Sequence, residues 1–589
     1  MDKLPFTNNS LAIFKRRYLN RDEDGNFNET PEQVFARVCK ALADVEKGYN
    51  KNESEVNEIR LQFEDIMSSF EFIPAGRTLT NTGTQNPVVA NCIVLNIEDS
   101  MDSIFNILKD AAVLSQAGSG LGFPFHLLRP AGMVAKKSNG VSSGPVSFLR
   151  VYNAAFSVVF QQNRNAANMA VMSIDHPDIL EFIDCKRKEG DISLFNISIA
   201  LTNEFMEAVV SKDEKPWYCK WKEEKMKPRL IYRDKWGHVS QIDEVTMTAH
   251  ELFDRIVDSA WSNGEPGIVF LDKVNETNQV PGLGRIEACN PCGEQFLHSS
   301  DVCNLGSLNL EKFVKNSKID FERLKHVTKV AIRMLDNVVD VSTFPVESIN
   351  NVSKDNRRLG LGVMGFADML YLMGIPYNSE EGINTAKQVM ETINTAAHLM
   401  SHELALEKGT FKNYDKSIYA PQKYLMRNAA CTTVAPTGSI SLVFEVSGGV
   451  EPYFALSYFK NAEGMDPLIY TNKHLLKALK DEGLATESIL KKIAREGSVQ
   501  NIDEITDKIK KIYVCSMDIS PIDHIKMQAA FQQYVDNSIS KTCNFPNDST
   551  KEDVASGYIL AWQMGCKGCT VYRDGSRVEQ VLTLGKDKQ

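Results

Sequence analysis

Residues 288–310 read A-C-N-P-C-G-E-Q-F-L-H-S-S-D-V-C-N-L-G-S-L-N-L, and the rest of the chain is organised around them. Asn290, Cys292 and Glu294 alternate with a proline and a glycine, which exclude an ordinary helix because proline fixes φ and glycine admits unusual conformations. With a period of two, the three polar side chains project to one side of a shaped loop. An amide, a thiol and a carboxylate facing one point predict a reactive site. The alternative is a Gly/Pro turn beside a buried cysteine.

On both sides of this loop, short apolar segments alternate with longer stretches of helical periodicity. The segments expected as strands are 92–95, 195–201, 268–271, 307–310, 431–434 and 570–572, and the long helices 321–343, 380–408 and 521–535. This alternation favours an α/β sheet or barrel. Before it, Thr30 and Gln33 form a capping-box signal ahead of an apolar stripe, which predicts a small helical cap.

Composition limits the class of protein. The 589 residues carry a net charge of −10, which argues against a general nucleic-acid binder because no basic excess can follow phosphates. Neither an N-terminal signal core nor an apolar run long enough for a membrane span is found, so a cytoplasmic location without membrane association is expected. Twelve cysteines are too few for a disulfide scaffold, so reduced thiols are the default and any disulfide should be catalytic.

Three further motifs each have a plain alternative. The glycine-rich run 118–122 lacks the Lys-Ser/Thr of a P-loop, and a turn is the simpler interpretation. Residues 435–441, A-P-T-G-S-I-S, offer hydroxyls and an open backbone to phosphate, or they cap the next helix. The pairs Cys289/Cys292 and Cys566/Cys569 are too far apart in sequence, and too poor in nearby histidine, to predict a zinc site, so no metal is expected.

The ordered motifs resemble one family, the catalytic subunit of ribonucleotide reductase, and most closely its adenosylcobalamin-dependent class II. The resemblance runs from about residue 10 to about residue 582. The motifs that carry it include R-R-Y-L-N-R-D-E-D-G, P-A-G-R-T-L, N-C-I-V-L, S-G-S-G-L-G-F, H-P-D-I-L-E-F-I, N-G-E-P-G-I-V-F-L-D, N-P-C-G-E, C-N-L-G-S-L-N-L, R-R-L-G-L-G-V-M-G-F-A-D, A-P-T-G-S-I-S, S-G-G-V-E-P and G-C-K-G-C-T-V-Y-R-D-G-S-R.

The resemblance implies a fold and a chemistry. The fold is a ten-stranded α/β barrel with a central finger loop carrying the radical cysteine, expected over 81–578, after a helical cap over 1–80 and before a short tail over 579–589. Cys292 would form a thiyl radical that abstracts the 3′ hydrogen of the ribose, Glu294 would act as general base, and Asn290 would hold the ribose hydroxyls. Cys92 and Cys303 would supply the reducing equivalents and end as a disulfide, which requires adjacent strands.

The resemblance also implies binding sites for substrate and effector. Thr78 and Asn91 would contact the substrate, and its phosphates would meet a loop formed by Pro436, Thr437, Gly438, Ser439, Ile440 and Ser441. A deoxynucleoside triphosphate effector at a homodimer interface would meet Asp99 and Arg129, although Asp99 could equally be an N-cap. The specificity loop, with Asn163, Arg164 and Asn165, departs from the family's G-G-x-R-R-G-A, so effector control is less secure than catalysis.

Missing family features bear on the radical source and the reductant. No ATP cone is expected, and T-V-Y-R-D-G-S-R at 570–577 replaces the Tyr-Tyr pair of class I. No glycyl-radical motif of class III is present. The chain is therefore expected to reduce ribonucleotides, as diphosphates, with adenosylcobalamin, for DNA synthesis and repair; the alternative is a class I large subunit that needs a metal-radical partner. Without the usual CxxC tail, either Cys566 and Cys569 shuttle electrons or a thioredoxin-like reductant reaches Cys92 and Cys303 directly.

Overall fold

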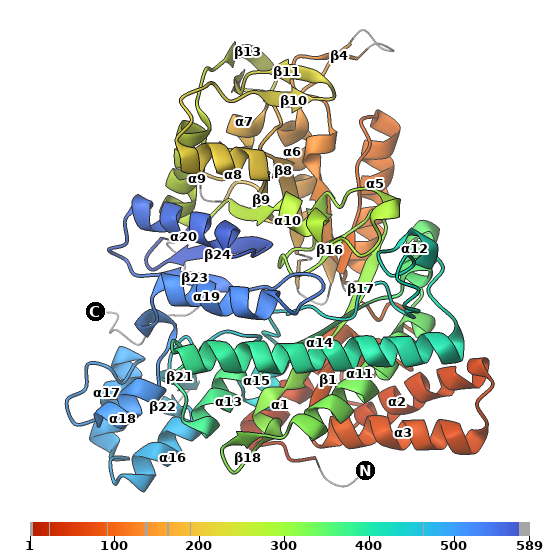
Figure 1. The fold of residues 1–589 in the computed structure, drawn as a ribbon, viewed down its shortest axis with the longest axis vertical. Coiled ribbons are helices and arrows are strands. Elements are labelled where there is room, and N and C mark those ends of the chain that lie inside the picture. Colours follow the sequence, from red (N-terminus) through yellow and green to blue (C-terminus); the bar gives the residue numbers. More distant parts are fainter. Residues whose placement is uncertain are drawn as a thin grey trace.

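The computed structural model describes residues 4–22, 24–90, 92–135, 140–161, 164–165, 167–188, 190–462 and 465–576. Four helices form the N-terminal cap: α1 (Asn8–Tyr18), α2 (Pro31–Asp44), α3 (Glu53–Ser68) and α4 (Gly76–Asn81). The capping box predicted at Thr30 and Gln33 is confirmed at the start of α2. Figure 1 shows the cap beside the long helices α11 (Phe321–Val341) and α14 (Glu380–Lys408) at one end of the molecule.

A ten-stranded sheet forms the centre of the protein. Its strands are β1 (Phe72–Pro74), β2 (Cys92–Val94), β3 (Gly120–Pro124), β8 (Asn168–Ser173), β9 (Phe195–Leu201), β14 (Gly267–Phe270), β17 (Val302–Asn309), β20 (Arg358–Met364), β23 (Thr542–Phe545) and β24 (Gly568–Arg573). They follow the order β1-β17-β2-β3-β8-β9-β14-β24-β23, and β20 pairs with the other edge of β17. The predicted α/β architecture with ten strands is confirmed.

Apart from β1, which pairs with β17 in the antiparallel sense, the sheet consists of two sets of strands: the second contains the parallel pairs β17 with β20 and β23 with β24. The first set is β2, β3, β8, β9 and β14, and it meets β17 on one side and β24 on the other in antiparallel pairs. Two isolated bridges, Leu361 to Thr432 and Val434 to Ile539, extend the hydrogen bonding from β20 toward the segment that leads into β23. The sheet therefore curls toward closure around its inner face.

Segment 431–434, predicted as a strand, forms only those isolated bridges. Its first two amides are taken by a side chain: the N–H groups of Cys431 and Thr432 both donate to Oδ2 of Asp536, at 2.8 and 3.2 Å. A carboxylate that binds two consecutive amides removes them from a strand ladder. The prediction of a regular strand was wrong here because a residue more than one hundred positions away competes for the backbone.

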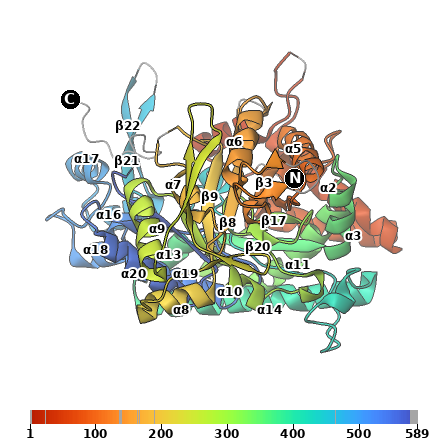
Figure 2. The same ribbon diagram turned by 90° about the horizontal axis from the view of Figure 1, so that it is seen from above.

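Helices surround the sheet, as Figure 2 shows from above. On the side of the first parallel set lie α5 (Met101–Gln116), α6 (Pro145–Phe156), α7 (Ile179–Asp184), α8 (Asn203–Ser211), α9 (Ala249–Asn263), α10 (Leu271–Glu276) and α20 (Lys551–Gln563). The remaining helices are α12 (Glu347–Asn356), α13 (Phe366–Met373), α15 (Ile440–Phe444), α16 (Lys473–Asp481), α17 (Glu487–Glu496), α18 (Asp507–Ile512) and α19 (Pro521–Gln532). No helix in the described ranges is both long and apolar enough to cross a membrane.

Seven two-stranded ribbons are found in the described residues outside the main sheet. They are β4 (Val134–Ala135) with β5 (Gly140–Val141), β6 (Phe160–Gln161) with β7 (Arg164–Asn165), β10 (Cys219–Trp221) with β11 (Glu224–Met226), β12 (Arg229–Arg233) with β13 (Val239–Glu244), β15 (Ala288–Cys289) with β16 (Phe296–Leu297), β18 (Val314–Lys315) with β19 (Lys318–Ile319), and β21 (Ser457–Ala462) with β22 (Met465–Thr471). Of these, the β15–β16 ribbon contacts β3 and β8 of the main sheet.

Side chains alternate between the two faces of the sheet, as the period of two requires. In β2, Ile93 packs outward among the helices, whereas Cys92 and Val94 face inward. The inner cluster also contains Ala288, Cys289, Phe296 and Leu297 of the β15–β16 ribbon. The sheet therefore encloses residues 288–297, which belong to the stretch predicted to form a reactive site.

Candidate active site

The β15–β16 ribbon forms a finger whose tip is residues 290–295. The backbone of Asn290 pairs with Gln295, donating its N–H to the Gln295 carbonyl at 2.9 Å, and Gly293 turns the tip with a φ of 76°. The finger passes very close to β3: a Cβ added at Gly122 would lie 1.9 Å from the carbonyl oxygen of Cys289. Only glycine at this position lets the finger enter the sheet's interior.

Asn290 and Glu294 meet Cys92 of strand β2 at the tip. The Asn290 amide nitrogen donates to the Cys92 sulfur at 3.2 Å, and the Cys92 thiol lies 3.9 Å from Oε1 of Glu294. The Asn290 amide oxygen accepts the N–H of Gln295 at 3.0 Å, which fixes the orientation of the amide. The amide and the carboxylate of the finger are thus both in contact with one thiol of the predicted redox pair.

Glu294 is a buried carboxyl group with few partners. Its Oε2 has no hydrogen-bond partner, and in the described part of the chain no Lys or Arg forms an ion pair with it. Removal from water disfavours the charged form, so burial raises the pKa of Glu294 to about 7. A carboxyl group with this pKa can accept and return a proton near neutral pH.

Cys292 sits at the outermost point of the finger and is the one exposed thiol among the cysteines. It opens onto a cavity of about 250 Å³, walled by the finger, the ends of β8, β9, β14 and β24, and the segment 539–542; the wall includes Met169, Asn196, Ser198, Pro436, Lys541 and Thr570. Although the thiol is accessible from the cavity, the protein around the cavity removes it from bulk water, and this desolvation raises the pKa of Cys292 well above its usual range, so it is held as a neutral S–H. An S–H group, rather than a thiolate, therefore faces the cavity.

The charged groups in this wall are neutralised by partners. The Lys541 ammonium lies 2.6 Å from Oε2 of Glu451, and Lys186 lies 2.5 Å from Oε2 of Glu265. The space next to Cys292 is therefore polar, and the charges of Lys541 and Glu265, which line it, are both paired. Such a space suits an uncharged polar group such as a sugar ring.

Cys92 and Cys303 lie directly opposite each other in the antiparallel pair of β2 and β17. Opposed residues in such a pair have Cα atoms about 4.5–5.5 Å apart, inside the range of about 4.4–6.8 Å that disulfides span. Both thiols are buried, and burial raises the pKa of each well above its usual range. On the other side of Cys303, Arg358 of β20 is its partner in register and pairs with Asp301 at 2.6 Å.

A set of polar residues that sequence reasoning missed holds the finger in place. Thr433 donates its hydroxyl to the Glu294 carbonyl at 2.7 Å, and the N–H of Ser538 donates to the same oxygen at 3.1 Å. The Asn537 side chain accepts the N–H of Phe296 at 2.9 Å, and Asn196 donates to the Pro291 carbonyl at 3.0 Å. These residues lie in unrelated segments, so nothing local in the sequence marks them.

The loop 436–441 extends from the cavity to the surface. Pro436 lines the cavity beside Cys292. Thr437 has a φ of 52°, and its hydroxyl accepts the N–H of Gly449 at 2.8 Å. Gly438 is exposed and Ser439 partly exposed, whereas Ile440 and Ser441 are buried. Of the predicted phosphate contacts, the open backbone at Gly438 and Ser439 is therefore the accessible part.

Thr78 and Asn91 are the two other predicted substrate contacts. Thr78 on α4 is buried, and its hydroxyl donates to the Val89 carbonyl at 2.9 Å. Asn91 lies outside the described residues. Thr78 thus holds the segment that leads into β2, and its role toward substrate stays a prediction.

Asp99 and Arg129, the predicted effector contacts, form an ion pair. The Arg129 Nε lies 2.9 and 3.0 Å from the two Asp99 oxygens, and the backbone N–H of Arg129 donates to Oδ1 at 3.1 Å. The N-cap of α5 is Ser100, not Asp99, because the Ser100 side chain accepts the N–H of Ser103. The N-cap alternative for Asp99 is therefore wrong.

The predicted specificity loop is described only in part. Asn163 lies outside the described residues, and Arg164 and Asn165 form β7, which pairs with Phe160 and Gln161 of β6. This ribbon follows α6 and precedes β8 in the sequence. Its role in effector control stays a prediction.

Cys566 and Cys569, the possible thiol shuttle, are buried in the apolar layer between the sheet and helices α9 and α20. Burial raises the pKa of both thiols. Between them, the Lys567 ammonium is buried and donates to the backbone carbonyls of Asp536 and Asn537, at 2.7 and 2.5 Å. Cys566 thus lies in the core, Cys569 is buried but is also among the residues that line the cavity next to Cys292, and Lys567 reaches the segment that holds the finger.

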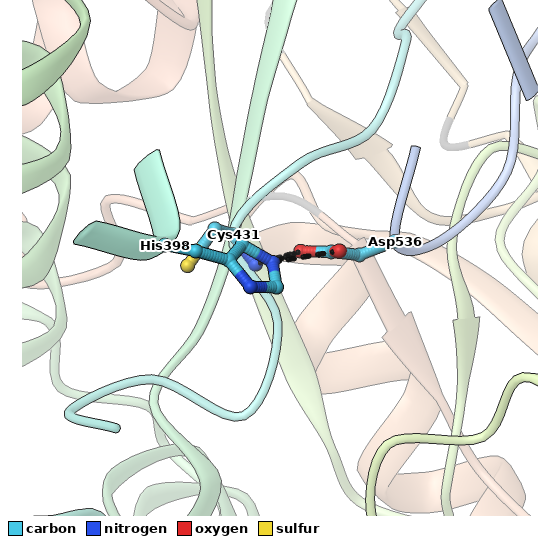
Figure 3. A group of neighbouring side chains, drawn as sticks. All are labelled: His398, Cys431 and Asp536. Atoms are coloured by element: carbon cyan, nitrogen blue, oxygen red, sulfur yellow. Dashed lines mark hydrogen bonds and ion pairs between the residues drawn. The ribbon is translucent and has the colours of Figure 1, made fainter. Parts of the chain in front are cut away.

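His398, Cys431 and Asp536 have ligand atoms within 4.8 Å of one another, the one group in the described ranges with metal-binding composition. Nε2 of His398 lies 2.9 and 3.0 Å from the Asp536 oxygens, which also accept from Asn394 and two backbone amides. The Cys431 sulfur points away from that carboxylate (Figure 3). The Asp536 oxygens are already bonded, so the cluster is accounted for as an ion pair that anchors segment 536–538.

A ten-stranded sheet encloses a finger loop, with one thiol facing a cavity and a pair of thiols behind it, which defines a class of large α/β proteins with cysteines at the centre of the sheet. Comparisons with known proteins give the family. The model of the ribonucleotide reductase barrel domain matches residues 90–572, and that of the ribonucleotide reductase all-alpha domain matches residues 4–87. The chain therefore belongs to the ribonucleotide reductase family.

Relatives of known name agree with this assignment. The chain is 37% identical to the vitamin B12-dependent ribonucleoside-diphosphate reductase of Thermoplasma acidophilum, over 99% of this chain and 81% of that protein. It is 38% identical to the protein of that name from Mycobacterium tuberculosis, over 100% and 82%. Among solved structures, the class Id ribonucleotide reductase alpha subunit of Actinobacillus ureae superposes with a TM-score of 0.77 over 97% of both chains, at 21% identity, which supports the fold.

Proposed function

We propose that this protein reduces ribonucleoside diphosphates to 2′-deoxyribonucleotides, with adenosylcobalamin as the radical source, and so supplies precursors for DNA synthesis and repair in the cytoplasm. One observation carries the proposal: the exposed Cys292 thiol faces a cavity while Asn290 and Glu294 of the same finger meet Cys92, which lies opposite Cys303. The names of the B12-dependent relatives support the choice of cofactor and substrate.

Each residue of this site has a separate role in the reaction. As a thiyl radical, Cys292 takes the 3′ hydrogen atom of the ribose. Glu294 then removes the proton of the 3′ hydroxyl while the protonated 2′ hydroxyl leaves as water. Cys92 and Cys303 provide two electrons and two protons and become a disulfide, after which Cys292 returns the 3′ hydrogen. The sum is one ribonucleotide and two thiols converted to one deoxyribonucleotide, one disulfide and one water.

The accessibility and the protonation state of Cys292 both fit the proposed cofactor. When bound, adenosylcobalamin supplies an organic radical, and such a radical must reach a neutral thiol. Cys292 meets both requirements, since it is exposed to the cavity and burial keeps its pKa high. The residues available to hold the reacting end of the cofactor are those of the cavity wall, among them Gly264, Ser198 and Thr570.

Re-reduction of the Cys92–Cys303 disulfide requires an external dithiol, which we propose is a thioredoxin-like protein. Both cysteines are buried behind the finger, so the reductant reaches them through the cavity or after the finger moves. Cys569 lines the cavity, but Cys566 does not and is fully buried, which favours direct reduction over a shuttle that needs both thiols.

We further propose a homodimer that binds a deoxynucleoside triphosphate effector. The outer face of α5 exposes Met101, Phe105 and Val113, with 60%, 47% and 40% of their surfaces accessible. An apolar helix face of this kind supports a subunit interface. The Asp99–Arg129 ion pair lies at the start of α5, where an effector bound at the interface would exchange Asp99 for its own phosphate as the partner of Arg129.

The decisive experiment assays the purified chain with adenosylcobalamin and dithiothreitol alone, over all four ribonucleoside diphosphates with each effector. Deoxynucleotide formation that Cys292→Ala abolishes is the expected result. Activity that appears only after a metal-containing partner subunit is added would identify a class I large subunit instead. Cys92→Ser separates the roles of the thiols, because it should permit at most one slow turnover while Cys566→Ser retains full activity.

A further inference from the structure

The first helix of the protein contacts the loop that we propose holds the substrate phosphates. Thr7 donates its hydroxyl to Oε1 of Glu445 at 2.9 Å, Ser10 donates to the Val443 carbonyl, and Nη1 of Arg17 donates to the Ser439 hydroxyl at 2.6 Å. Three contacts along one helix, from its N-cap to its last turn, fix α1 against α15 and the loop before it. The cap region is therefore part of the phosphate end of the site.

The sequence of α1 places a cation at this position. Phe14 and Tyr18 are buried at helical spacing, which turns the intervening Lys15, Arg16 and Arg17 toward solvent in the last turn. Only Arg17 of these three bonds to the loop. A matched neighbour of the same type, Arg16, is exposed one position away, so the chain supplies its own control.

The chain from Pro436 to Ser439 connects the cavity at Cys292 with Arg17. Cys292 and Pro436 line the same cavity, and Gly438 follows two residues later with nothing within 4 Å of the place a Cβ would occupy. Ser439 comes next and accepts from Arg17. A nucleotide whose ribose lies at Cys292 would run its phosphates over the open backbone of Gly438 toward this guanidinium.

The charge of Arg17 is available for a ligand. In the described ranges no carboxylate forms an ion pair with it, and the nearby Glu445 is held by Thr7 through Oε1. A neutral hydroxyl is thus its partner on the loop. A guanidinium offers several N–H donors in one plane, a geometry that matches phosphate oxygens and binds them more strongly than a hydroxyl.

We propose that Arg17 is a specificity-determining residue that binds the terminal phosphate of a nucleoside diphosphate substrate. This inference rests on the function proposed above. In the complex, a β-phosphate oxygen replaces the Ser439 hydroxyl as the acceptor of the Arg17 N–H, while the α-phosphate stays over Gly438. A nucleoside monophosphate ends before it reaches Arg17 and gains nothing from it.

Steady-state kinetics with a diphosphate and the matching monophosphate test the role. Arg17→Ala is expected to raise KM for the diphosphate by about tenfold or more, the equivalent of one charged hydrogen bond, with kcat unchanged. KM for the monophosphate should not move, and Arg17→Lys should restore part of the affinity. Arg16→Ala removes the same charge and should leave every parameter unchanged.

Equilibrium binding of the diphosphate to the Cys292→Ala protein, with and without Arg17→Ala, tests the contact without turnover. The added substitution should weaken binding by the same factor and reduce its dependence on salt concentration. Unchanged binding, or equal losses in Arg16→Ala and Arg17→Ala, would overturn the assignment while the reductase function stands. Failure of the wild-type protein to reduce any nucleotide would sink the function instead, and the binding result would still decide on Arg17.

Discussion

Asp336 and Glu294 are both buried carboxyl groups, but their surroundings are opposite. Asp336 on α11 accepts from Nε of Arg357 at 2.9 Å and from the Asn428 amide at 2.9 Å, with Arg427 and Lys408 at 3.4 and 3.7 Å. Although burial opposes ionisation, these cations hold the pKa of Asp336 well below its usual range. Among the described residues no cation pairs with Glu294, and burial raises its pKa to about 7.

The difference shows how one protein uses buried acids for two purposes. The Asp336 cluster joins the cap to the barrel, because Glu46, in the short 3-10 helix Val45–Tyr49 after α2, pairs with Arg333 and Lys408 beside it. Every charge there has a partner, so the cluster is inert and rigid. Glu294 instead keeps one oxygen without a partner, and its proton is exchangeable at neutral pH. Pairing stabilises the fold, whereas the lack of pairing makes a reactive group.

The largest expected effect is on turnover in Glu294→Gln. The amide cannot accept the 3′ hydroxyl proton, so kcat should fall by about 10²–10⁴-fold. The thermal unfolding midpoint should stay the same or rise, because the substitution removes a buried charge without breaking an ion pair. Product formation and differential scanning calorimetry measure the two quantities. A large drop in the unfolding midpoint would mean that Glu294 is structural, like Asp336.

Asp336→Asn should show the reverse pattern. It leaves the guanidinium and ammonium groups around it without their shared anion, and breaking a buried pair costs about 3–5 kcal/mol. The free energy of unfolding in urea should fall by that amount, while kcat per folded molecule is retained. The control is Asp355→Asn, which breaks the exposed pair with Lys412 at 3.0 Å and should cost less than about 1 kcal/mol. Equal losses in the two variants would contradict the comparison.

The smallest expected effect is in the pH dependence, and its sign differs between the two groups. As a base, Glu294 must be ionised, so kcat should fall about tenfold per pH unit below its pKa of about 7. Because that pKa is raised above the unfolded value of about 4.3, its contribution to stability is present below pH 4.3 and is lost as pH rises through 7. The depressed pKa of Asp336 gives a contribution that is present above about 3.9 and lost on further acidification.

A pH–rate profile and urea unfolding at several pH values separate these contributions. In Glu294→Gln, the residual activity should lose the limb near pH 7. If the limb remains in that variant, another group is the titrating base.

Much of the fold was readable from the sequence because its signals are local. The apolar periodicity of 380–408 coincides with α14, and the predicted strand 195–201 coincides with β9. The shaped loop at 290–294 was predicted from its own alternation of residue types, and its role as a central finger came from the family resemblance. The placement of Cys92 beside Cys303 came from the family resemblance, and the structure shows the two residues in register.

The residues that sequence reasoning missed act through contacts between distant segments. Asn537 supports the finger from 241 positions away, and Arg17 reaches Ser439 across 422 positions. Lys567 lies between Cys566 and Cys569. The CxxC spacing of these cysteines suggested a role for the thiols, and the lysine between them was not considered. Polar side chains of this kind leave no periodic pattern, because their partners are fixed only when the chain is folded.

Strand β17 must be synthesised before the centre of the sheet can form, because it pairs with three other strands. It pairs with β1 of the cap region, with β2 of the first parallel set, and with β20 of the second. A ribosome delivers β1 and β2 long before Val302, the first residue of β17. Until then the edges of β1 and β2 that pair with β17 have no neighbour, and unpaired edges are sites of aggregation. Protection of these edges during synthesis would favour correct folding, and the Cys92 thiol has no Cys303 opposite it until β17 has emerged.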